Sequence, residues 1–319
     1  MPEETAVIEM LAGDVGATVE RFRTEILETV HSAGAALLRG FDQLSVDEFA
    51  SVAEIILQDV ATDNGEHEPV EASSIVQTPV PFSHERKLLW HNENSFNHSW
   101  PLIIMFSPVV VATSGGRTPL TDSRELLKVL DPKIVDLFRE RGVMYVRRFG
   151  NGIGLPWQKV FGTDGRTELE YRAAADRVEL EWGGGETLIT RSVRPAVITH
   201  PLTGELAWFG QPTHWHPACL DEETREAMID VLGADNLPRD CRFGDGSVIA
   251  NSIMEELVAA YQSIERSFDW VVGDVLIVDN VLSAHARNPY EGPRRLLVAM
   301  GDKYEFAEPM GTDTRRIAQ

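Results

Sequence analysis

Short apolar runs dominate the chain after about residue 100, and Gly, Pro and Asp separate them. Runs that end at turn-forming residues are typical of β-strands, and many of them in succession predict a sandwich or a barrel. The longest apolar stretch, Pro101 to Ala112, contains Pro108 and is shorter than the roughly 20 residues of a membrane helix, so we interpret it as a buried strand pair. The expected strands span residues 102–105, 109–112, 143–149, 196–200, 206–209, 275–278 and 296–300.

The strands expected near residues 100 and 280 are far apart in the sequence, and neither has an obvious local partner. A closed double-stranded β-helix requires such distant pairing, so this jelly-roll or cupin-like core is the fold we expect. Helices interrupt the strands, which makes the chain mainly β with flanking helices. These helices are expected at residues 123–130, 132–141, 222–232 and about 247–267.

The first third of the chain has a different pattern. Val19, Phe22, Ile26 and Val30 recur at helical spacing, residues 35–38 form a short apolar run, and a second helix is expected from Ser45. Residues 59–81 lack a periodic pattern and predict a long loop that is mobile or closes over a site. No break in composition marks a second domain. We therefore expect one domain over residues 1–319, with a mainly helical part at 1–80 and the β core at 81–303.

The chain is strongly acidic, with 29 Lys and Arg against 50 Asp and Glu and a net charge of −21. Nucleic acids and anionic membranes both bind through basic segments, so neither is an expected partner. The sequence has two cysteines and begins without a charged and apolar leader, which argues against disulfides and secretion and favours the cytoplasm. The oligomeric state is not indicated.

His91 and Glu93 are two residues apart, and side chains at i and i+2 of an extended backbone project to the same face. Alone the pair is weak evidence, because a chain with 9 His and 50 acidic residues contains such pairs by chance. His285, at the end of another expected strand, is the candidate third ligand. Two histidines and one carboxylate are typical of non-heme Fe(II) oxygenases, whereas structural zinc normally has four protein ligands.

The sequence resembles the Fe(II)/2-oxoglutarate dioxygenases of the taurine dioxygenase (TauD/TfdA) family, and within it the SyrP-like branch of hydroxylases that act on amino acids or carrier-bound acyl groups. The resemblance covers about residues 80–303. It rests on an ordered series of motifs: Trp90-His91-Asn92-Glu93, Trp100-Pro101, Gly115-Gly116-Arg117-Thr118-Pro119, residues 142–147, residues 200–205, Trp208-Phe209, residues 244–247, residues 273–276, Asp279-Asn280, His285-Ala286-Arg287 and Gly292-Pro293-Arg294-Arg295.

The resemblance implies that His91, Glu93 and His285 bind the iron and act in catalysis. It also implies that Thr118 and Arg294 bind the distal carboxylate of 2-oxoglutarate, with O2 as the oxidant. The planar guanidinium of Arg294 suits a carboxylate, and strand alternation sends Arg295 to the opposite face. The substrate candidates are Asn94, Ser95 and Arg295.

Many family members have Asp where this chain has Glu93, and halogenating relatives replace that carboxylate by a small residue. Glu93 therefore favours oxygenation. The resemblance implies hydroxylation of an unactivated C–H bond in an amino acid or a derived small molecule, free or tethered to a carrier protein, in specialised (antibiotic) metabolism, with release of succinate and CO2. Desaturation, epoxidation, cyclisation or oxidative decarboxylation with the same cofactors remain open, as does a non-catalytic binding or regulatory protein.

Several other polar residues have competing interpretations. His214 and His216 could share a metal, although a structural or substrate-positioning role is favoured. His31 and His67 are expected to be ordinary surface or core histidines. Asp279 and Asn280 could orient the ligand His285 or cap a strand. The basic clusters at 147–148 and 191–194 are expected on the solvated surface, with an anion-binding site as the alternative.

Overall fold

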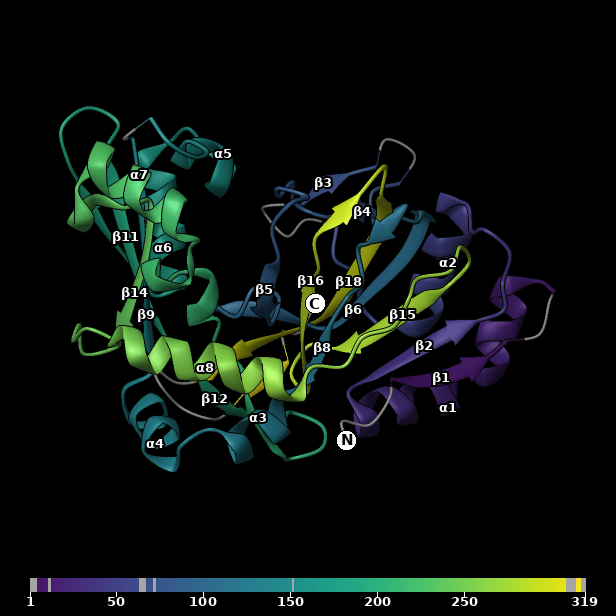
Figure 1. The fold of residues 1–319 in the computed structure, drawn as a ribbon. Helices are drawn as coiled ribbons and strands as arrows, with labels where there is room; N and C mark the ends of the chain where they lie inside the picture. The colour runs from purple at the N-terminus through teal and green to yellow at the C-terminus, as the bar shows by residue number, and fades with distance from the viewer. Residues whose placement is uncertain are drawn as a thin grey trace.

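The largest sheet of this computed structural model has the strand order β1-β2-β15-β6-β18-β4-β3, and β19 pairs with β18 (Figure 1). The structure describes residues 5–10, 13–62, 67–70, 73–150, 152–307 and 314–316. β6 pairs with β15 along one edge and with β18 along the other, which confirms that segments near residues 100 and 280 meet. The strands are β1 Ala6–Glu9, β2 Ala35–Arg39, β3 Glu68–Pro69, β4 Gln77–Thr78, β6 Ser99–Val110, β15 Val275–Asp279, β18 Arg295–Phe306 and β19 Thr314–Arg316.

A smaller sheet packs on one face of the large sheet and completes the double-stranded β-helix. Its order is β5-β16-β8, with β5 at Leu88–His91, β16 at Ser283–Arg287 and β8 at Leu120–Asp122. Leu120 of this sheet belongs to the same buried cluster as Phe106, Leu276 and Val298 of the large sheet. Beside it, β7 (Ser114–Gly115) pairs with β17 (Tyr290–Glu291).

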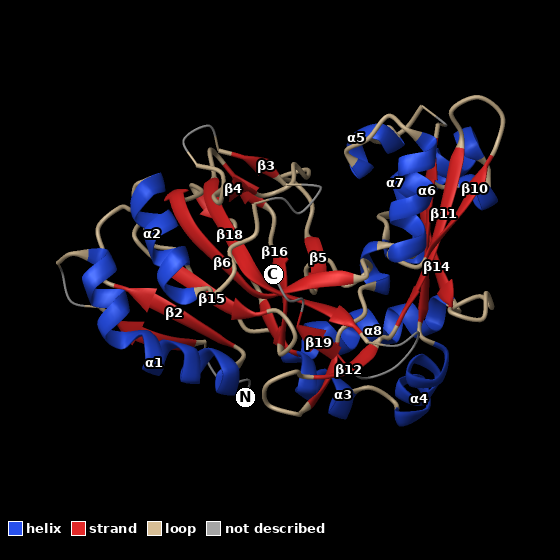
Figure 2. Ribbon diagram, turned by 180° about the vertical axis from the view of Figure 1, so that it is seen from behind, coloured by secondary structure: helices blue, strands red, loops and turns tan. Residues whose placement is uncertain are grey.

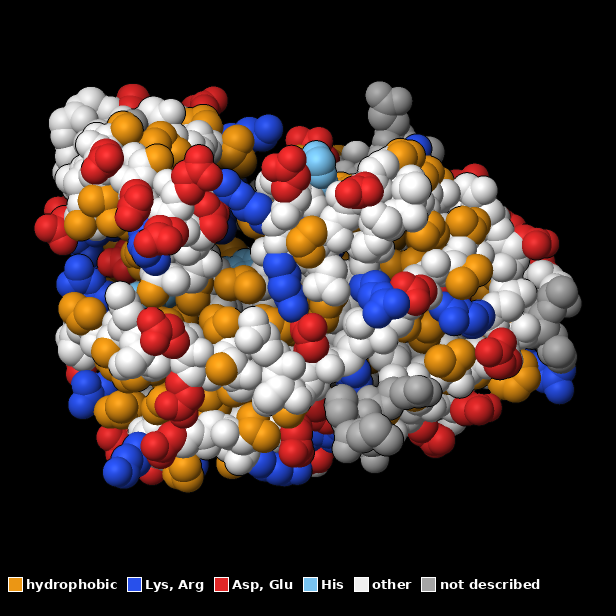
Figure 3. All heavy atoms as spheres, in the orientation of Figure 1, with side chains coloured by type: hydrophobic (Ala, Val, Ile, Leu, Met, Phe, Trp, Pro, Cys, Tyr) orange, Lys and Arg blue, Asp and Glu red, His pale blue; other side chains and the backbone are white. Residues whose placement is uncertain are grey.

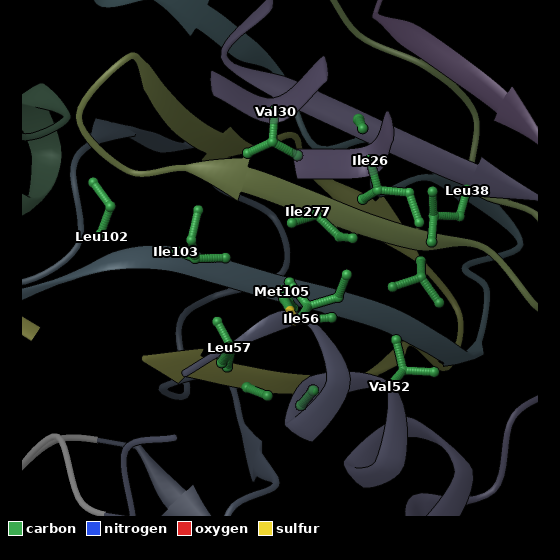
Figure 4. Close-up of a cluster of buried hydrophobic side chains, with 14 of the residues drawn as sticks. Ile26, Val30, Leu38, Val52, Ile56, Leu57, Leu102, Ile103, Met105 and Ile277 are labelled. Atoms are coloured by element: carbon green, nitrogen blue, oxygen red, sulfur yellow. The ribbon is translucent and has the colours of Figure 1, made fainter. Parts of the chain in front are cut away.

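Helices α1 (Val15–Ala33) and α2 (Val46–Ile56) cover the other face of the large sheet (Figure 2). Their apolar stripes pack onto the strands in one cluster (Figure 4), in which Ile26, Ile56 and Met105 are buried. Ser45 begins α2 with a capping box to Glu48, which satisfies backbone donors at the helix start. The helix, strand and helix expected in the first third are thus confirmed.

A third sheet forms a lobe beside the β-helix, on the left in Figure 1, with its own small core of Phe149, Trp157, Leu169 and Leu188. Its order is β10-β11-β9-β14. Helices α3, α4 and α8 and the β12-β13 hairpin lie at the base of the lobe. The bounds are β9 Val143–Phe149, β10 Val178–Trp182, β11 Leu188–Arg194, β12 Val197–Thr199, β13 Leu206–Trp208, β14 Arg239–Phe243, α3 Ser123–Val129, α4 Pro132–Arg141, α5 Trp157–Phe161, α6 Arg166–Ala175, α7 Glu222–Leu232, α8 Asn251–Ile264, and the 3-10 turns η1 Pro212–His214, η2 Pro217–Cys219 and η3 Ala234–Asn236.

The expected strand pair at Pro101–Ala112 is instead a single strand, β6. β15 pairs with β6 only from Ile103 to Phe106, so Pro108 lies beyond that ladder, where a missing N–H removes no bond to β15. The helix expected at 247–267 is shorter and begins at Asn251. No helix in the described ranges is both long and apolar enough to cross a bilayer. The assignment of residues 1–319 to a single domain remains a prediction.

Candidate active site

His91, Glu93 and His285 meet between the two sheets of the β-helix. β5 and β16 pair antiparallel with His91 directly opposite His285, and the two imidazole centroids are 4.2 Å apart. Each of the three residues offers one ligand atom, and these atoms lie within 4.8 Å of one another. His91 and Glu93 are neighbours in the sequence, whereas His285 is 194 positions after His91, and the three converge because β16 pairs alongside β5.

Glu93 reaches this cluster from a turn, and not from an extended strand as we expected. Asn280, the residue after β15, holds that turn: its Oδ1 accepts from the Glu93 N–H at 2.6 Å, and its Nδ2 donates to the Glu93 carbonyl at 3.0 Å. Asn92 Nδ2 donates in return to the Asn280 carbonyl at 2.7 Å. Asn280 thus orients the backbone of Glu93, and not the His285 ring that we considered, whose Nδ1 has no hydrogen-bond partner among the described residues.

The environment of the two histidines favours neutral rings. Burial lowers the pKa of His91, although Glu93 opposes this shift. Burial also lowers the pKa of His285 well below its usual value, and the neighbouring His91 and His214 add to the effect. A neutral imidazole keeps a lone pair for a metal ion. Neither ring nitrogen of His285 hydrogen-bonds to a described residue, and the ring is 6% exposed.

His214 and His216 do not form a shared metal site. They lie at two 3-10 turns, and not on a strand. The His214 ring packs 4.2 Å from His91 and lies 2.7 Å through Nε2 from the Leu89 carbonyl, whereas His216 Nε2 lies 3.0 Å from the Ile249 carbonyl. His214 therefore braces His91, and His216 has a structural contact elsewhere.

Thr118 and Arg294 line the same cavity, and Arg294 contacts Gly116, two residues before Thr118. Arg294 Nε donates to the Gly116 carbonyl at 3.2 Å, and its guanidinium lies 5.5 Å from the centroid of Tyr290. Gly116 has φ +71°, and a Cβ there would come within 3.2 Å of Arg294, so glycine both permits the turn and makes room for the arginine. Arg295 is exposed, as alternation predicted.

A cavity of about 610 Å³ joins these groups. Its described lining includes all three candidate iron ligands together with Thr118 and Arg294. Glu93 is the one carboxylate among the lining residues in the described ranges, and the lining cations are Lys87, Arg239, Arg287, Arg294 and Arg295. On the face shown in Figure 3, a hollow lies between the lobe and the rest of the molecule, with Lys or Arg side chains at its margin. The cavity therefore favours anionic ligands in an acidic protein.

The other substrate candidates are placed differently. Asn94 lines a separate cavity of about 180 Å³, with φ 58°, and Ser95 is fully buried. Arg295 lines the rim of the large cavity. Residues 78–81 of the expected covering loop also line the large cavity, and residues 63–66 and 71–72 of that loop lie outside the described residues. Asn94 and Ser95 are thus not brought to the cavity that holds the histidines.

The basic clusters of the third sheet lie outside this cavity. Arg194 is 2% exposed and donates to the carbonyls of Phe96 and Asp176 at 3.2 and 2.7 Å. Arg191 pairs with Glu181 at 2.7 Å. Arg194 therefore has a structural role, which differs from the solvated position that we expected for its cluster.

Two sets of contacts near the site could not be predicted from the sequence. His67 lies 3.9 Å through Nε2 from Glu93 Oε2 and lines the large cavity. His31, Asp279 and His200 form a cluster, half-buried at His31 and buried at the other two residues, in which Asp279 Oδ2 accepts from His31 Nδ1 and His200 Nε2, both at 2.8 Å. The pairings span long stretches of chain, so only the folded structure reveals them.

The His31–Asp279–His200 cluster connects α1, the β12-β13 hairpin and the end of β15. His200 Nδ1 accepts from the N–H groups of Leu202 and Thr203, so its ring proton sits on Nε2, where it is donated to Asp279. Burial raises the pKa of Asp279, but the bonds from His200 and His31 outweigh it and hold the pKa below its ordinary value. The cluster therefore stabilises the residue that precedes Asn280.

Asp279→Asn is expected to lower the free energy of unfolding by about 3 kcal/mol, because the amide N–H would face the His200 donor in a buried site. Urea denaturation at pH 7 measures this change. The exposed Asp269→Asn variant is the control and should change stability little. A carboxylate with a lowered pKa stabilises the fold above the unfolded pKa of about 3.9, so the difference from wild type should shrink as the pH falls below about 4. An unchanged unfolding midpoint for Asp279→Asn would contradict the role of the cluster.

Comparison with known proteins gives concordant matches over nearly the whole chain. The family model described as taurine catabolism dioxygenase TauD, TfdA family matches residues 12–300. The dapdiamide synthesis protein DdaC of Enterobacter agglomerans is 32% identical over 296 residues, which cover 92% of this chain and 90% of the relative. A clavaminate synthase-like protein of Arabidopsis thaliana is 27% identical over 286 residues, which cover 85% and 82%.

Solved structures show the same fold. The crystal structure of a taurine dioxygenase from Burkholderia xenovorans superposes with a TM-score of 0.55 at 14% identity and covers 94% of this chain and 87% of its own. The double-stranded β-helix is therefore confirmed independently of the sequence motifs. From the family model and the identity to DdaC, this chain belongs to the TauD/TfdA family of Fe(II)- and 2-oxoglutarate-dependent dioxygenases.

Proposed function

We propose that the chain binds Fe(II) through His91, Glu93 and His285 and 2-oxoglutarate through Thr118 and Arg294, and that it hydroxylates an unactivated C–H bond of an amino acid or an amino-acid-derived small molecule. The observation that carries this proposal is the convergence of the three ligand atoms within 4.8 Å of one another, at a cavity that Thr118 and Arg294 also line.

The residues fit the proposed metal. Two neutral imidazoles and one carboxylate match the donor set that leaves positions open on Fe(II). The His285 ring is buried and has no hydrogen bond to a described residue, which is an unfavourable state for a polar ring unless it binds something else. The retained carboxylate of Glu93 supports oxygenation, since it occupies the position that halogenating relatives leave open.

When bound, Fe(II) and 2-oxoglutarate supply the oxidising chemistry, in which O2 and 2-oxoglutarate give succinate, CO2 and one oxygen atom for the substrate. The protein's residues do the positioning. Asn280 fixes the backbone of Glu93, and His214 packs against the His91 ring. Arg294 is half-buried and offers a planar cation for a carboxylate where little water screens its charge.

The metabolic setting of the proposal comes from the relatives. The protein that is 32% identical is named for dapdiamide synthesis, which supports a place for this chain in specialised metabolism. We propose a small-molecule substrate, which is either free or tethered to a carrier protein. The cations that line the cavity favour a substrate with an anionic group in either form.

Anaerobic addition of Fe(II) and 2-oxoglutarate to the purified chain should produce a visible metal-to-ligand charge-transfer band, because the keto acid chelates the metal. The band should saturate at one equivalent of iron. Zn(II) in place of Fe(II) is the control and should give no band. Absence of the band in folded protein, as judged by circular dichroism, would contradict the cofactor assignment.

A screen for succinate release then tests the substrate class. Free amino acids are assayed first, and mass spectrometry of the product separates hydroxylation, which adds one oxygen, from desaturation, which removes two hydrogens. Turnover with a free amino acid would support the free form. If the protein shows the charge-transfer band but no free amino acid supports succinate release, the result would favour a substrate tethered to a carrier protein.

A further inference from the structure

The wall that carries Thr118 contains a second polar group, the indole of Trp270. Trp270 lies in the segment between α8 and β15 and is 7% exposed, and its Nε1 donates to Thr118 Oγ1 at 3.1 Å. We propose that Trp270 is a positioning residue for the co-substrate, and that its N–H orients the Thr118 hydroxyl so that the hydroxyl proton is directed to the distal carboxylate of 2-oxoglutarate. This inference rests on the proposed function, in which Thr118 binds that carboxylate.

The direction of the hydrogen bond follows from the chemistry of the two groups. An indole N–H can only donate, so Thr118 Oγ1 must be the acceptor. A hydroxyl has one proton, and this proton is then left to donate to another group. Thr118 is 4% exposed, lines the cavity, and makes no other side-chain hydrogen bond within the described residues. A carboxylate oxygen in the cavity is the acceptor that would complete the arrangement.

The segment that carries Trp270 is fixed to the strand that follows Thr118. Leu120 and Arg266 exchange two backbone hydrogen bonds, Leu120 N–H to Arg266 carbonyl at 2.8 Å and the reverse at 2.9 Å. On the other side of Trp270, Asp274 Oδ2 accepts from the Val271 N–H at 2.8 Å. Arg39 clamps the same Asp274 carboxylate at 2.7 and 2.8 Å. The backbone is therefore fixed on both sides of Trp270, which keeps the indole N–H in a constant position relative to Thr118.

Trp270 also fills space, and this role must be separated from the first. It belongs to the cluster that contains Leu120 and Phe106, and the Phe268 ring packs against it with centroids 4.8 Å apart. Loss of this packing would lower stability without a specific effect on one ligand. Orientation of the Thr118 hydroxyl would instead change the affinity for 2-oxoglutarate, and would do so only while the hydroxyl is present.

The sharpest variant replaces Trp270 by its sulfur isostere, 3-benzothienylalanine, which keeps the shape and removes the N–H. Trp270→Phe is the genetically simple companion. Both should raise the dissociation constant for 2-oxoglutarate about 10-fold, measured by anaerobic titration of the charge-transfer band, because the hydroxyl is free to turn away from the carboxylate. The KM for 2-oxoglutarate should rise in parallel, with kcat and the dissociation constant for Fe(II) close to wild type.

Two further variants complete the design. Phe268→Leu loosens the same wall without touching Thr118 and should lower stability while the affinity for 2-oxoglutarate stays within about 2-fold. In a Thr118→Val background, which has no hydroxyl to orient, Trp270→Phe should have no additional effect on that affinity. This double-mutant cycle isolates the coupling between the two side chains.

Wild-type affinity in the isostere, or an undiminished effect of Trp270→Phe in the Thr118→Val background, would overturn the inference and leave the proposed function in place. Failure of the wild-type protein itself to bind 2-oxoglutarate would remove the proposed function and the inference with it. A 10-fold weaker affinity in the isostere that vanishes without the Thr118 hydroxyl would establish Trp270 as a positioning residue.

Discussion

Replacing His285 by alanine is expected to abolish substrate-dependent succinate formation, with a loss of about three orders of magnitude or more. The imidazole is one of three converging donors, and the remaining His91 and Glu93 would hold Fe(II) much more weakly. The buried ring makes no hydrogen bond to a described residue, so its removal takes away no other polar contact. Bound iron after gel filtration, together with the charge-transfer band, measures the metal site independently of turnover.

His216→Ala is the matched control, because this histidine is similarly buried but its Nε2 lies against the Ile249 carbonyl, away from the cavity. It should lower the unfolding free energy and retain both iron and the band. Retained turnover in His285→Ala, or loss of iron in His216→Ala with an intact fold, would require a different set of ligands.

The candidate ligands could be predicted because motifs that resemble a known family carry them, but their geometry could not. His91 and His285 are 194 positions apart, and only the pairing of β5 with β16 places them opposite one another. Glu93 lies in a turn, and not on the extended strand that we expected. Its side chain enters the cluster from a turn that Asn280 holds, so the carboxylate is positioned by a hydrogen-bonded amide and not by strand alternation.

The contacts that sequence patterns missed share a physical cause. Trp270 with Thr118, His67 with Glu93 and Asp279 with His200 are pairs that lie far apart in the chain, and periodicity carries no information about such contacts. The same limit applies to β11 and α6 of the lobe, which have no clear apolar period in the sequence. The N-terminal helices were predictable because their apolar stripes and the cap at Ser45 are local signals.

The net charge of the whole chain does not describe the charge of the site. The chain carries −21, yet among the described residues that line the cavity Glu93 faces five Lys and Arg side chains. Bound Fe(II) would add further positive charge to the cavity, and the two carboxylates of 2-oxoglutarate would compensate part of it. Arg294 is the cation best placed to bind the distal carboxylate, because it is inward and partly buried whereas Arg295 is exposed.

Arg294→Gln is therefore expected to raise the dissociation constant for 2-oxoglutarate about 100-fold, since it removes one partner of a desolvated, bidentate ion pair. Burial lowers the pKa of the Arg294 guanidinium to about 10, which keeps it cationic at neutral pH. Arg294→Lys should recover only part of the affinity, because an ammonium group is a point charge and cannot bind two carboxylate oxygens in one plane. Anaerobic titration of the charge-transfer band measures the dissociation constant for 2-oxoglutarate in the wild type, in Arg294→Gln and in Arg294→Lys.

Arg295→Gln is the control for charge, because it removes the same charge one residue further on, from an exposed side chain. Its effect on the affinity for 2-oxoglutarate should be less than about 3-fold and should fade as salt is added, since exposed charges are screened. The opposite ranking, with Arg295→Gln the more damaging change, would mean that the bulge between Arg295 and Leu296 shifts when ligand binds and that Arg295 is the residue that turns inward.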